Sequence, residues 1–429
     1  MAVKRVSGKT KERNPSQDGS GPEAARQSER VDAAVITRRA ADRLRAGHLW
    51  VYRSDVTAVP ETTSGLLPVR DARGALLGTA LYSPSSEIAL RLISREEIAS
   101  EAEWLQILAD RLRVAIEARH DVISREDTNA CRLVFSEADN LPGVIADKYG
   151  DVIVFQLLTK ALDNEAVRIV ATSVLKDALR PAVVVERPDA RIRELEQLDV
   201  PLDAAPLYIR DDASLQTVFQ INGLNFHYDA SAGQKTGAFL DQRENYAATA
   251  RYAHGDALDV CTYQGGFALH LARTCAQVTG IDVSRAALEV AEKNQAANRD
   301  TLRADVDWIE ANAFDLLRDW SISGTTYDTI VLDPPAFAKS KRAVEGALRG
   351  YKELNLRAFK MMRPGGVLVT CSCSHHVSLG DFTAVVAAAA GDAGRRVRLI
   401  ERRGAAADHP VILTIPETEY LKCLICAVE

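Results

Sequence analysis

The sequence predicts an α/β protein in which a parallel sheet with helices on both faces follows two smaller domains. From residue 256 onward, strand-like and helical segments alternate, and repeated strand–helix units build such a sheet. Residues 31–97 instead contain short apolar runs separated by turn residues, which is typical of a small β-rich domain. Residues 98–205 combine helical and strand-like segments and predict a central α+β domain. The length of 429 residues agrees with this division, because domains commonly span about 100–200 residues.

Composition excludes several classes of protein. Hydrophobic residues make up 47% and charged residues 26% of the chain, as in soluble globular proteins. The net charge of −6 excludes a uniformly basic coat for nucleic acid, so any RNA contact must come from local basic patches. No apolar run approaches the roughly 18 residues that span a bilayer, and no export signal is visible. We therefore expect a cytoplasmic protein without a membrane partner.

The seven cysteines are expected to be reduced thiols, because an odd count without an export signal is typical of a cytoplasmic protein. The pairs Cys371–Cys373 and Cys423–Cys426 lie in strand-like apolar runs without turn residues between their members. Structural zinc sites need loops there, so no metal is expected.

The first elements follow from apolar periodicity and turn signals. Residues 1–30 are polar and are predicted to form a disordered tail. Apolar residues at helical spacing predict a helix over residues 99–120, and a second helix is expected over 164–179. The run AVVVER, residues 182–187, is predicted as a strand shortly before the central domain ends near residue 205.

The last domain, residues 206–429, begins with a predicted hairpin at 218–229. Asn222-Gly223 lies between its two β-rich runs, which is the strongest short-range signal for a two-residue turn. Strands are then expected in ALDVCTY, QVTGIDV, VDWIEA, YDTIVLD and GGVLVTC. HPVILTIP and YLKCLICAVE are predicted to pair as an antiparallel hairpin that closes the sheet. Helices are expected to begin near Gly265, Ser284 and Arg342.

The ends of the first two parallel strands indicate a ribose-bearing ligand. Ligands of open α/β sheets bind at the carboxyl ends of the strands. The first strand runs into Gln264-Gly265-Gly266, where glycines let the backbone approach a ligand, and Asp282 ends the next strand about twenty residues later. The fingerprint G-x-G-x-x-G is absent, which disfavours a dinucleotide. The glycine pair also fits tight packing of a strand against a helix.

The third strand ends in residues that suit an adenine ring. Asn312 could hydrogen-bond the adenine edge, with Ala313 and Phe314 as an apolar seat. Asn312 equally fits an ordinary cap of the following helix, so both interpretations stay open.

The fourth and fifth strands end in groups that could carry chemistry. Pro334 and Pro335 lock the backbone after Asp333 and form a stiff corner that presents its carboxyl group. The fifth strand carries Cys371 and Cys373, and a thiol just past a strand end beside this corner is well placed as a nucleophile. The two cysteines share one face of a strand, so alternation does not choose between them. A polar segment before the sheet, residues 233–243, indicates a binding loop that opens a helix.

With these features the sequence resembles the PUA-containing class I S-adenosylmethionine-dependent rRNA methyltransferases, specifically the bacterial 23S rRNA cytosine-C5 enzymes. The resemblance covers nearly everything after the tail. It implies a PUA domain at residues 31–97, a central α+β domain at 98–205 that helps to hold RNA, and a Rossmann-like class I methyltransferase domain at 206–429. The matching segments are HLWVY, SEADNLPG, QKTGAFLDQR, CTYQGGFAL, GIDVS, LDPPAFAKSK, LRGYKELN, TCSCS and ADHPVILTIPETEYLK.

The resemblance also implies the site residues. Cys373 matches the family's cysteine, which makes Cys373 and Asp333 the catalytic pair and Cys371 a packing residue. Asp282 is implied to bind the ribose hydroxyls and Asn312 the adenine, although a related sequence has Asp at that position. The full set implied to bind S-adenosylmethionine is Lys235, Thr236, Asp241, Gln242, Arg243, Asp259, Tyr263, Gly265, Gly266, Asp282, Asn312, Ala313, Asp333 and Pro334.

The implied mechanism follows from the chemistry of cytosine, whose carbon 5 is a poor nucleophile. Attack of the Cys373 thiolate on carbon 6 would load negative charge onto carbon 5, which could then take the methyl group from the sulfonium. Asp333, protonated or sharing a proton, would hydrogen-bond N3 and the exocyclic amine. A base that the sequence does not identify removes the carbon 5 proton. The target must be unpaired or flipped out of its stack.

The expected substrate is 23S rRNA or a pre-ribosomal particle, and a homodimer is compatible with the sequence. One alternative is a methyltransferase for another RNA base, such as a guanine nitrogen or a tRNA cytosine. Another is a non-catalytic RNA-binding factor, and an NAD-dependent oxidoreductase is disfavoured by the missing fingerprint. The basic residues expected at the RNA are Arg38, Arg39, Arg43, Arg45 and His48, with Lys339, Lys341, Arg342, Arg349 and Lys352 after the fourth strand.

Overall fold

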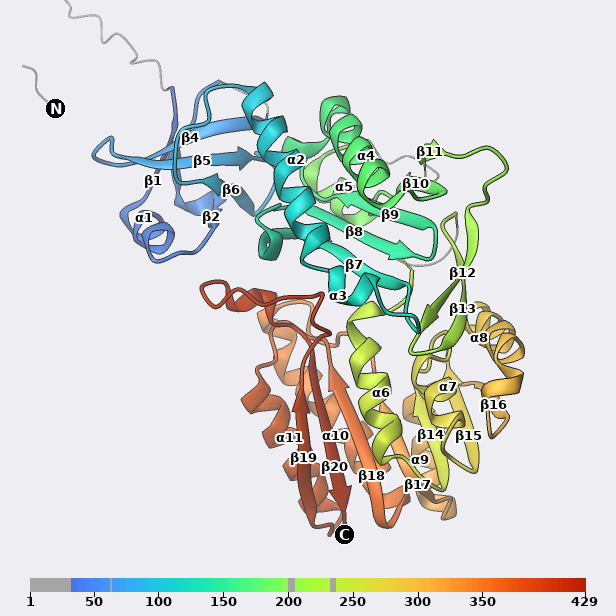
Figure 1. Cartoon of the computed structure of the whole chain (residues 1–429). Coiled ribbons are helices and arrows are strands. Elements are labelled where there is room, and N and C mark those ends of the chain that lie inside the picture. The colour runs from blue at the N-terminus through green and yellow to red at the C-terminus, as the bar shows by residue number, and fades with distance from the viewer. Residues whose placement is uncertain (1–31, 62–63, 200–204, 232–236) are drawn as a thin grey trace, which may run out of the picture.

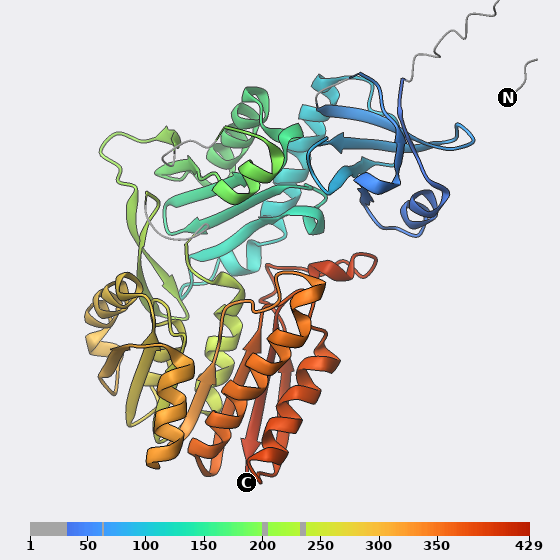
Figure 2. The ribbon, with the colours of Figure 1, turned by 180° about the vertical axis from the view of Figure 1, so that it is seen from behind.

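The computed structural model describes residues 32–61, 64–199, 205–231 and 237–429. These residues form two lobes, an upper one coloured blue to green and a lower one coloured yellow to red (Figure 1). The view from behind separates the same two lobes (Figure 2). The predicted tail at residues 1–30 lies outside the described residues, as do Lys235 and Thr236 of the predicted binding loop.

The first part of the upper lobe is a six-stranded sheet with one helix packed on it. The bounds are β1 (Ala34–Ile36), α1 (Arg38–Arg45), β2 (Trp50–Tyr52), β3 (Val56–Ala58), β4 (Gly65–Asp71), β5 (Leu76–Tyr82) and β6 (Ile88–Ser94). The strand order is β2-β6-β5-β4-β1-β3. Buried Ala40 and Leu44 pack α1 against aliphatic side chains of the sheet such as Val69. The predicted β-rich character is confirmed, whereas the short apolar runs do not predict α1.

The second part of the upper lobe is a five-stranded sheet of order β11-β10-β9-β8-β7 with helices. The helix α2 begins after Ser100, whose hydroxyl accepts the Glu103 amide, and α4 begins after Asn164, which caps it in the same way. Both predicted helices and the predicted strand β10 are therefore confirmed. The bounds are α2 (Glu101–Glu117), α3 (His120–Ile123), β7 (Ala130–Phe135), β8 (Val144–Tyr149), β9 (Val152–Leu157), α4 (Glu165–Leu179), β10 (Val183–Glu186), α5 (Ala190–Glu196) and β11 (Ala205–Ile209).

A hairpin connects the two lobes, as the Asn222-Gly223 signal predicts. Its strands are β12 (Gln216–Ile221) and β13 (Leu224–Asp229), and both turn residues have positive φ, 52° and 79°. On the upper side, the Asn222 amide donates to the Thr128 hydroxyl oxygen at 3.0 Å. On the lower side, the Asn225 amide donates to the Asn298 side chain at 2.8 Å. Figure 1 shows the hairpin running between the lobes.

The lower lobe is a seven-stranded sheet with helices on both faces (Figures 1 and 2). Its strand order is β16-β15-β14-β17-β18-β20-β19, in which only β20 runs antiparallel to its neighbours. Order reverses between β14 and β17, so their carboxyl ends flank the crevice where such sheets bind ligands. The bounds are α6 (Arg243–Tyr252), β14 (Asp256–Val260), α7 (Gly266–Ala272), β15 (Gln277–Asp282), α8 (Arg285–Ala297), β16 (Val306–Glu310), α9 (Ala313–Ser323), β17 (Tyr327–Leu332), α10 (Val344–Met361), β18 (Met362–Ser372), α11 (Leu379–Asp392), β19 (Val397–Arg403) and β20 (Lys422–Val428).

The prediction for the closing hairpin is half wrong. β20 is a strand as expected, but it pairs with β19 and β18 rather than with HPVILTIP. Residues 409–416 form a loop in which Leu413 is 92% exposed, because the prolines at both ends of that segment remove ladder donors. β19 is an edge strand with charged, mostly exposed residues, so its sequence carries little apolar alternation.

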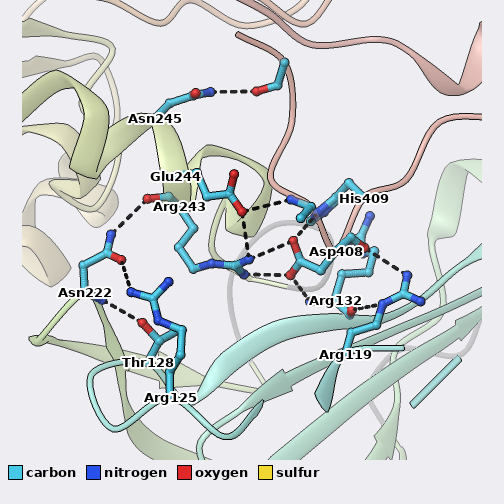
Figure 3. A network of polar contacts seen from close by, with 12 residues as sticks. Arg119, Arg125, Thr128, Arg132, Asn222, Arg243, Glu244, Asn245, Asp408 and His409 are labelled. Atoms are coloured by element: carbon cyan, nitrogen blue, oxygen red, sulfur yellow. Dashed lines mark hydrogen bonds and ion pairs between the residues drawn. The ribbon is translucent and has the colours of Figure 1, made fainter. Parts of the chain in front are cut away.

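A buried ion pair of the lower lobe lies where that lobe meets the upper one (Figure 3). Arg243, at the start of α6, donates from Nη1 and Nη2 to both carboxylate oxygens of Asp408, at 2.7 and 3.1 Å. The Arg132 backbone amide also donates to the Asp408 carboxylate, and the Arg119 guanidinium donates to the Asp408 carbonyl. Burial raises the pKa of Asp408, but the hydrogen bonds and charges of His409 and Arg243 outweigh it and hold that pKa well below its usual range. The carboxylate therefore stays ionised and keeps the lobes together.

The segment that carries this ion pair, residues 404–421, continues to the first sheet. The Thr414 hydroxyl donates to the Gly47 carbonyl at 2.9 Å, and His48 lies 3.7 Å from Glu417. Both ribbon views show the segment reaching from the lower lobe toward α1 (Figures 1 and 2). One segment of the lower lobe thus contacts both parts of the upper lobe and holds them against it.

We expect Asp408→Asn to lower the free energy of unfolding by about 3–5 kcal/mol, because it leaves the Arg243 guanidinium buried without a counter-charge. Urea unfolding followed by circular dichroism measures the change. Asp110→Asn is the matched control, because Asp110 forms an exposed ion pair with Arg113 and such pairs contribute about 0–1 kcal/mol. Equal losses in the two variants would contradict a special role of the buried pair.

Candidate active site

A buried carboxyl group lies at the end of β14. Asp259 is fully buried, and its Oδ2 accepts hydrogen bonds from the Thr262 hydroxyl at 2.5 Å and the Ala268 amide at 2.9 Å. Its Oδ1 has no hydrogen-bond partner among the described residues. Burial raises the pKa of Asp259 to about 7, against the lowering effect of the two hydrogen bonds. Among the described residues, the carboxyl group therefore has no cationic partner, and its Oδ1 has no hydrogen-bond donor.

The turn after β14 needs its glycines for conformation and packing. Tyr263 and Gly265 have φ of 52° and 86° in the left-handed region. A Cβ on Gly265 would lie 2.8 Å from the Trp308 ring, and one on Gly266 would lie 2.5 Å from the Tyr246 hydroxyl. The packing interpretation of the glycine pair is thus confirmed, and its contact with a cofactor stays a prediction.

Asp282, at the end of β15, fixes the adjoining turns. Its Oδ2 accepts the Tyr263 amide at 2.9 Å, and its Oδ1 accepts the Ser284 amide at 2.9 Å. Each carboxylate oxygen has a second acceptor position. The group thus lies at the strand ends where a ribose diol is expected, with acceptor capacity left for it.

Asn312 caps the helix α9. Its Oδ1 accepts the Phe314 amide at 2.9 Å and the Asp315 amide at 3.4 Å, and the residue is exposed. The capping interpretation is confirmed. Ala313 is the first residue of that helix, and contact of both residues with adenine stays a prediction.

Asp333 follows β17 directly and faces other carboxyl groups. Burial, with the charges of Asp241 and Asp259, raises the pKa of Asp333 to about 8, and a hydrogen bond with Gln242 acts in the opposite direction. At neutral pH the carboxyl group therefore largely keeps its proton and can donate a hydrogen bond. Pro334, which is buried, continues the stiff corner that holds it.

The two cysteines of the fifth strand separate in the structure. β18 ends at Ser372, so Cys373 lies just beyond the sheet, half-buried, with its Sγ 3.9 Å from the Pro334 carbonyl oxygen. Cys371 is fully buried and lies opposite Cys423 in the register between β18 and β20. The expectation that Cys371 is a packing residue is confirmed.

The predicted binding loop divides into residues at the site and one that is directed away from it. Asp241 accepts the Tyr420 hydroxyl at 2.6 Å, and buried Gln242 interacts with Asp333. Arg243 instead directs its guanidinium into the ion pair between the lobes, where it is fully buried. This geometry does not support a cofactor contact for Arg243. The sequence does not reveal this role of Arg243, because its partner, Asp408, lies 165 residues away in the chain.

Three polar side chains near Cys373 escape the sequence reasoning. The Tyr351 hydroxyl, from α10, is 2.9 Å from both the Ser372 and Ser374 hydroxyls. Tyr420 and Lys422 come from the segment that enters β20. The sequence signal for Lys422 is a lone charge inside the apolar run YLKCLICAVE.

Within the described residues, no group of three or more His, Cys, Asp or Glu side chains is arranged to hold a metal ion. In the same part of the chain, no helix combines the length and apolarity needed to cross a membrane.

Comparison with known families accounts for both lobes. Residues 35–95 match the PUA-like domain family, and residues 158–415, more than half of the chain, match the family of S-adenosylmethionine-dependent methyltransferases. The chain belongs to this methyltransferase family. The predictions of an enzyme, of S-adenosylmethionine as its cofactor and of a PUA-like domain before a Rossmann-like methyltransferase fold are thereby confirmed.

Curated relatives cover most of this methyltransferase. Proteins named ribosomal RNA large subunit methyltransferase I are 37% identical over 93% of the chain in Pseudoalteromonas translucida and 36% identical over 89% in Klebsiella pneumoniae. These matches cover 100% and 94% of the two relatives. Among solved structures, the methyltransferase SMU.776 in complex with SAH covers 92% of the chain with a TM-score of 0.77 and 19% identity, which shows the same fold.

The strand ends of the methyltransferase fit its cofactor. The methionine part of S-adenosylmethionine carries an ammonium group, and the unpartnered, buried Oδ1 of Asp259 would be able to accept a hydrogen bond from it. Asp282 keeps acceptor positions for ribose hydroxyls. Tyr263 and Gly265 would line the turn between these two carboxylates.

We expect the affinity for S-adenosylmethionine to rise with pH up to about 7 and to level off above it. Below that pH the Asp259 carboxyl is protonated in the free protein, and binding an ammonium group must first remove this proton. Each pH unit below 7 should therefore weaken binding by up to about tenfold. Titration calorimetry at pH 6, 7 and 8 measures the effect. Asp259→Asn should bind more weakly at pH 8 and lose the pH dependence, and a parent Kd that is equal at pH 6 and 8 would refute the assignment.

Proposed function

We propose that this methyltransferase modifies 23S rRNA at carbon 5 of a cytosine, with Cys373 as the covalent nucleophile and Asp333 at the pyrimidine edge. Relatives named for the ribosomal RNA of the large subunit support the substrate class. The observation that carries the proposal is the position of Cys373, just beyond β18, with its sulfur against the Asp333-Pro334 corner. The thiol and the protonated carboxyl thus lie at neighbouring strand ends beside the crevice.

The proposed reaction proceeds through a covalent bond between Cys373 and the cytosine ring. The Cys373 thiolate adds to carbon 6, which forms a sulfur–carbon bond and places an electron pair on carbon 5. S-adenosylmethionine, when bound, would supply the electrophilic methyl group and keep the electron pair of the broken sulfur–methyl bond. Carbon 5 forms the new carbon–carbon bond and then loses its proton to a base. The electrons of the broken C–H bond restore the double bond as the thiolate leaves, so one methyl group is gained and one proton released.

Asp333 would stabilise the charge that develops on the ring. A protonated carboxyl can donate to N3 and accept from the exocyclic amine of cytosine at the same time. Its raised pKa, about 8, keeps this proton in place at neutral pH. Because Asp333 is half-buried and directly precedes two prolines that lock the backbone, its hydrogen bonds are aimed before the reaction begins, which is the arrangement that stabilises a transition state.

Cys373→Ala should reduce methyl transfer to rRNA by at least about a thousandfold, because the covalent nucleophile is lost. The assay measures incorporation of the labelled methyl group and identifies the modified nucleoside by mass spectrometry. Cys371→Ala, two residues earlier in the strand, is the matched control and should retain most of the activity. Undiminished 5-methylcytosine with Cys373→Ala would refute the thiol mechanism, and a methylated guanine as product would refute the choice of base.

Most of the basic residues expected to bind RNA already interact with acidic residues of the protein itself. Six of the ten form ion pairs, and His48 lies 3.7 Å from Glu417. The ion pairs are Arg38 and Arg45 with Asp42, Arg39 and Arg43 with Asp55, Arg349 with Glu345, and Lys352 with Asp392. Lys339, Lys341 and Arg342 are exposed and have no ion pair among the described residues. They follow the Asp333 corner directly in the chain. We therefore propose that these three contact the RNA phosphates beside the target nucleotide.

Replacing Lys339, Lys341 and Arg342 with Ala should weaken RNA binding and flatten its salt dependence. The slope of log K against log salt should fall by up to about 2, because each lost phosphate contact removes about 0.7 for single strands. Filter binding at 50–300 mM salt measures the slope. Arg396→Ala/Arg398→Ala, at the opposite end of the sheet, is the control, and equal slopes for the triple variant and the parent would contradict the proposed contact.

A protein with this substrate acts where ribosomes are assembled, so we place it in the cytoplasm. Self-association into a homodimer remains a prediction from the sequence.

A further inference from the structure

A buried lysine lies beside the proposed nucleophile. Lys422, the first residue of β20, is 5% exposed. Its ammonium group donates to the Ser374 carbonyl at 2.7 Å and to the Tyr420 carbonyl at 2.7 Å. No carboxylate among the described residues lies within ion-pair distance of it. Burying an ammonium group in this way costs free energy unless an anion compensates its charge.

The anion that the geometry offers is the thiolate of Cys373. In the register between β18 and β20, Lys422 lies opposite Ser372, the residue before Cys373. Its ammonium is bound to the carbonyl of Ser374, the residue after Cys373. The cation is therefore held against the same three-residue segment that presents the sulfur. Burial lowers the pKa of Lys422 to about 8, and the charge of the Cys373 thiolate is the larger of the two influences that raise it.

We propose that Lys422 is a positioning residue for methyl transfer, whose ammonium group is the counter-ion of the Cys373 thiolate. The inference rests on the proposed function, in which that thiolate is the nucleophile. A cation beside a thiol favours the ionised form and so raises the fraction of reactive nucleophile at neutral pH. Since the two backbone carbonyls fix the ammonium, the charge is in place before RNA binds.

Other groups around the thiol do not supply this charge. Asp333 and Asp241 are carboxyl groups and cannot carry a positive charge. The pKa of Asp333 is raised, so it is mostly neutral at pH 7, and Asp241 accepts a hydrogen bond from the Tyr420 hydroxyl. The Tyr351 hydroxyl is neutral and bonded to two serines. Other charged or titratable groups of the described residues near the segment include Glu419, exposed His376, and Arg132, which is paired with Asp147. His375 lies there too, with its ring 5.3 Å from that of Tyr420. Glu419 carries the wrong sign, which leaves His375 as the competing cation.

The test measures the ionisation of the Cys373 thiol in the full-length protein without RNA. The rate of alkylation by iodoacetamide is followed from pH 6 to 9, and the modified peptide is quantified by mass spectrometry so that Cys373 is read alone. Lys422→Met should raise the apparent pKa of the thiol by about one unit or more and lower kcat at pH 7 about tenfold. KM for RNA should stay unchanged, because the lysine does not contact the substrate.

Two further variants separate charge from structure. Lys422→Gln keeps amide donors for the two carbonyls but removes the charge, and it should behave like the methionine variant. Lys422→Arg keeps the charge and should restore most of the thiolate. If the methionine variant does not fold, the Gln–Arg pair alone decides the question, and equal thiol ionisation in these two variants would overturn the proposal.

Lys148→Met is the matched control. The Lys148 ammonium also donates to two backbone carbonyls, those of Asn129 and Gly150, and burial also lowers its pKa, but it lies in the upper lobe. It should leave the Cys373 thiol unchanged. His375→Asn should likewise leave it unchanged, and a shift equal to that of Lys422→Met would assign the effect to the histidine instead. Cys373→Ala tests the nucleophile separately, so failure of the proposed function and failure of the lysine assignment give different results.

Discussion

The buried ion pair between Arg243 and Asp408 is the interaction on which the geometry of the site depends. Arg243 directly follows Gln242, which reaches Asp333, and Asp408 lies in the segment that leads to Tyr420 and Lys422. The pair therefore fixes two chain segments that both contribute side chains to the site. The same carboxylate also accepts the Arg132 amide of the upper lobe, so the position of the upper lobe and the position of the site are set by one group. A buried pair of this kind costs desolvation, and its geometric role explains why it is kept.

The electrostatics of the crevice follow from a local excess of carboxyl groups. Burial raises the pKa of Asp259 to about 7 and that of Asp333 to about 8, and neighbouring carboxyl groups add to both shifts, Asp282 for the first and Asp241 with Asp259 for the second. Such a site favours a cationic ligand, and S-adenosylmethionine carries both an ammonium and a sulfonium. The same surroundings keep the Asp333 carboxyl group protonated at neutral pH, so that it can donate a hydrogen bond. The opposite sign is needed only at the thiol, and Lys422 is the group that supplies it. Separate regions of one crevice therefore favour opposite charges, because each is defined by the residues that follow a different strand.

What could be predicted from the sequence is what local patterns encode. The strand ends at Asp259, Asp282 and Asp333 follow from apolar runs and turn residues, and the hairpin follows from Asn222-Gly223, because each signal lies within a few residues. The resemblance implies a cofactor contact for Arg243, yet its partner comes from a distant loop that no local pattern reveals. Local patterns do not reveal the role of Lys422 for a similar reason, because it depends on the register of β20 against β18. Neighbouring residues predict which side chains leave a strand, but not which distant group meets them.

The choice between Cys371 and Cys373 illustrates how a strand end determines chemistry. In a continuous strand the two would share a face and an environment. β18 ends between them, so the backbone leaves the sheet and the second sulfur turns toward the Pro334 carbonyl, whereas the first stays opposite Cys423 in the core. The serines on either side support this departure, because their hydroxyls are held by Tyr351 from α10. The prolines after β17 end the neighbouring strand opposite Thr370, two residues before β18 ends, so the Pro334 carbonyl lies beside the Cys373 sulfur at the edge of the sheet. The chemistry of the site thus depends less on the residue types alone than on where the two strands stop.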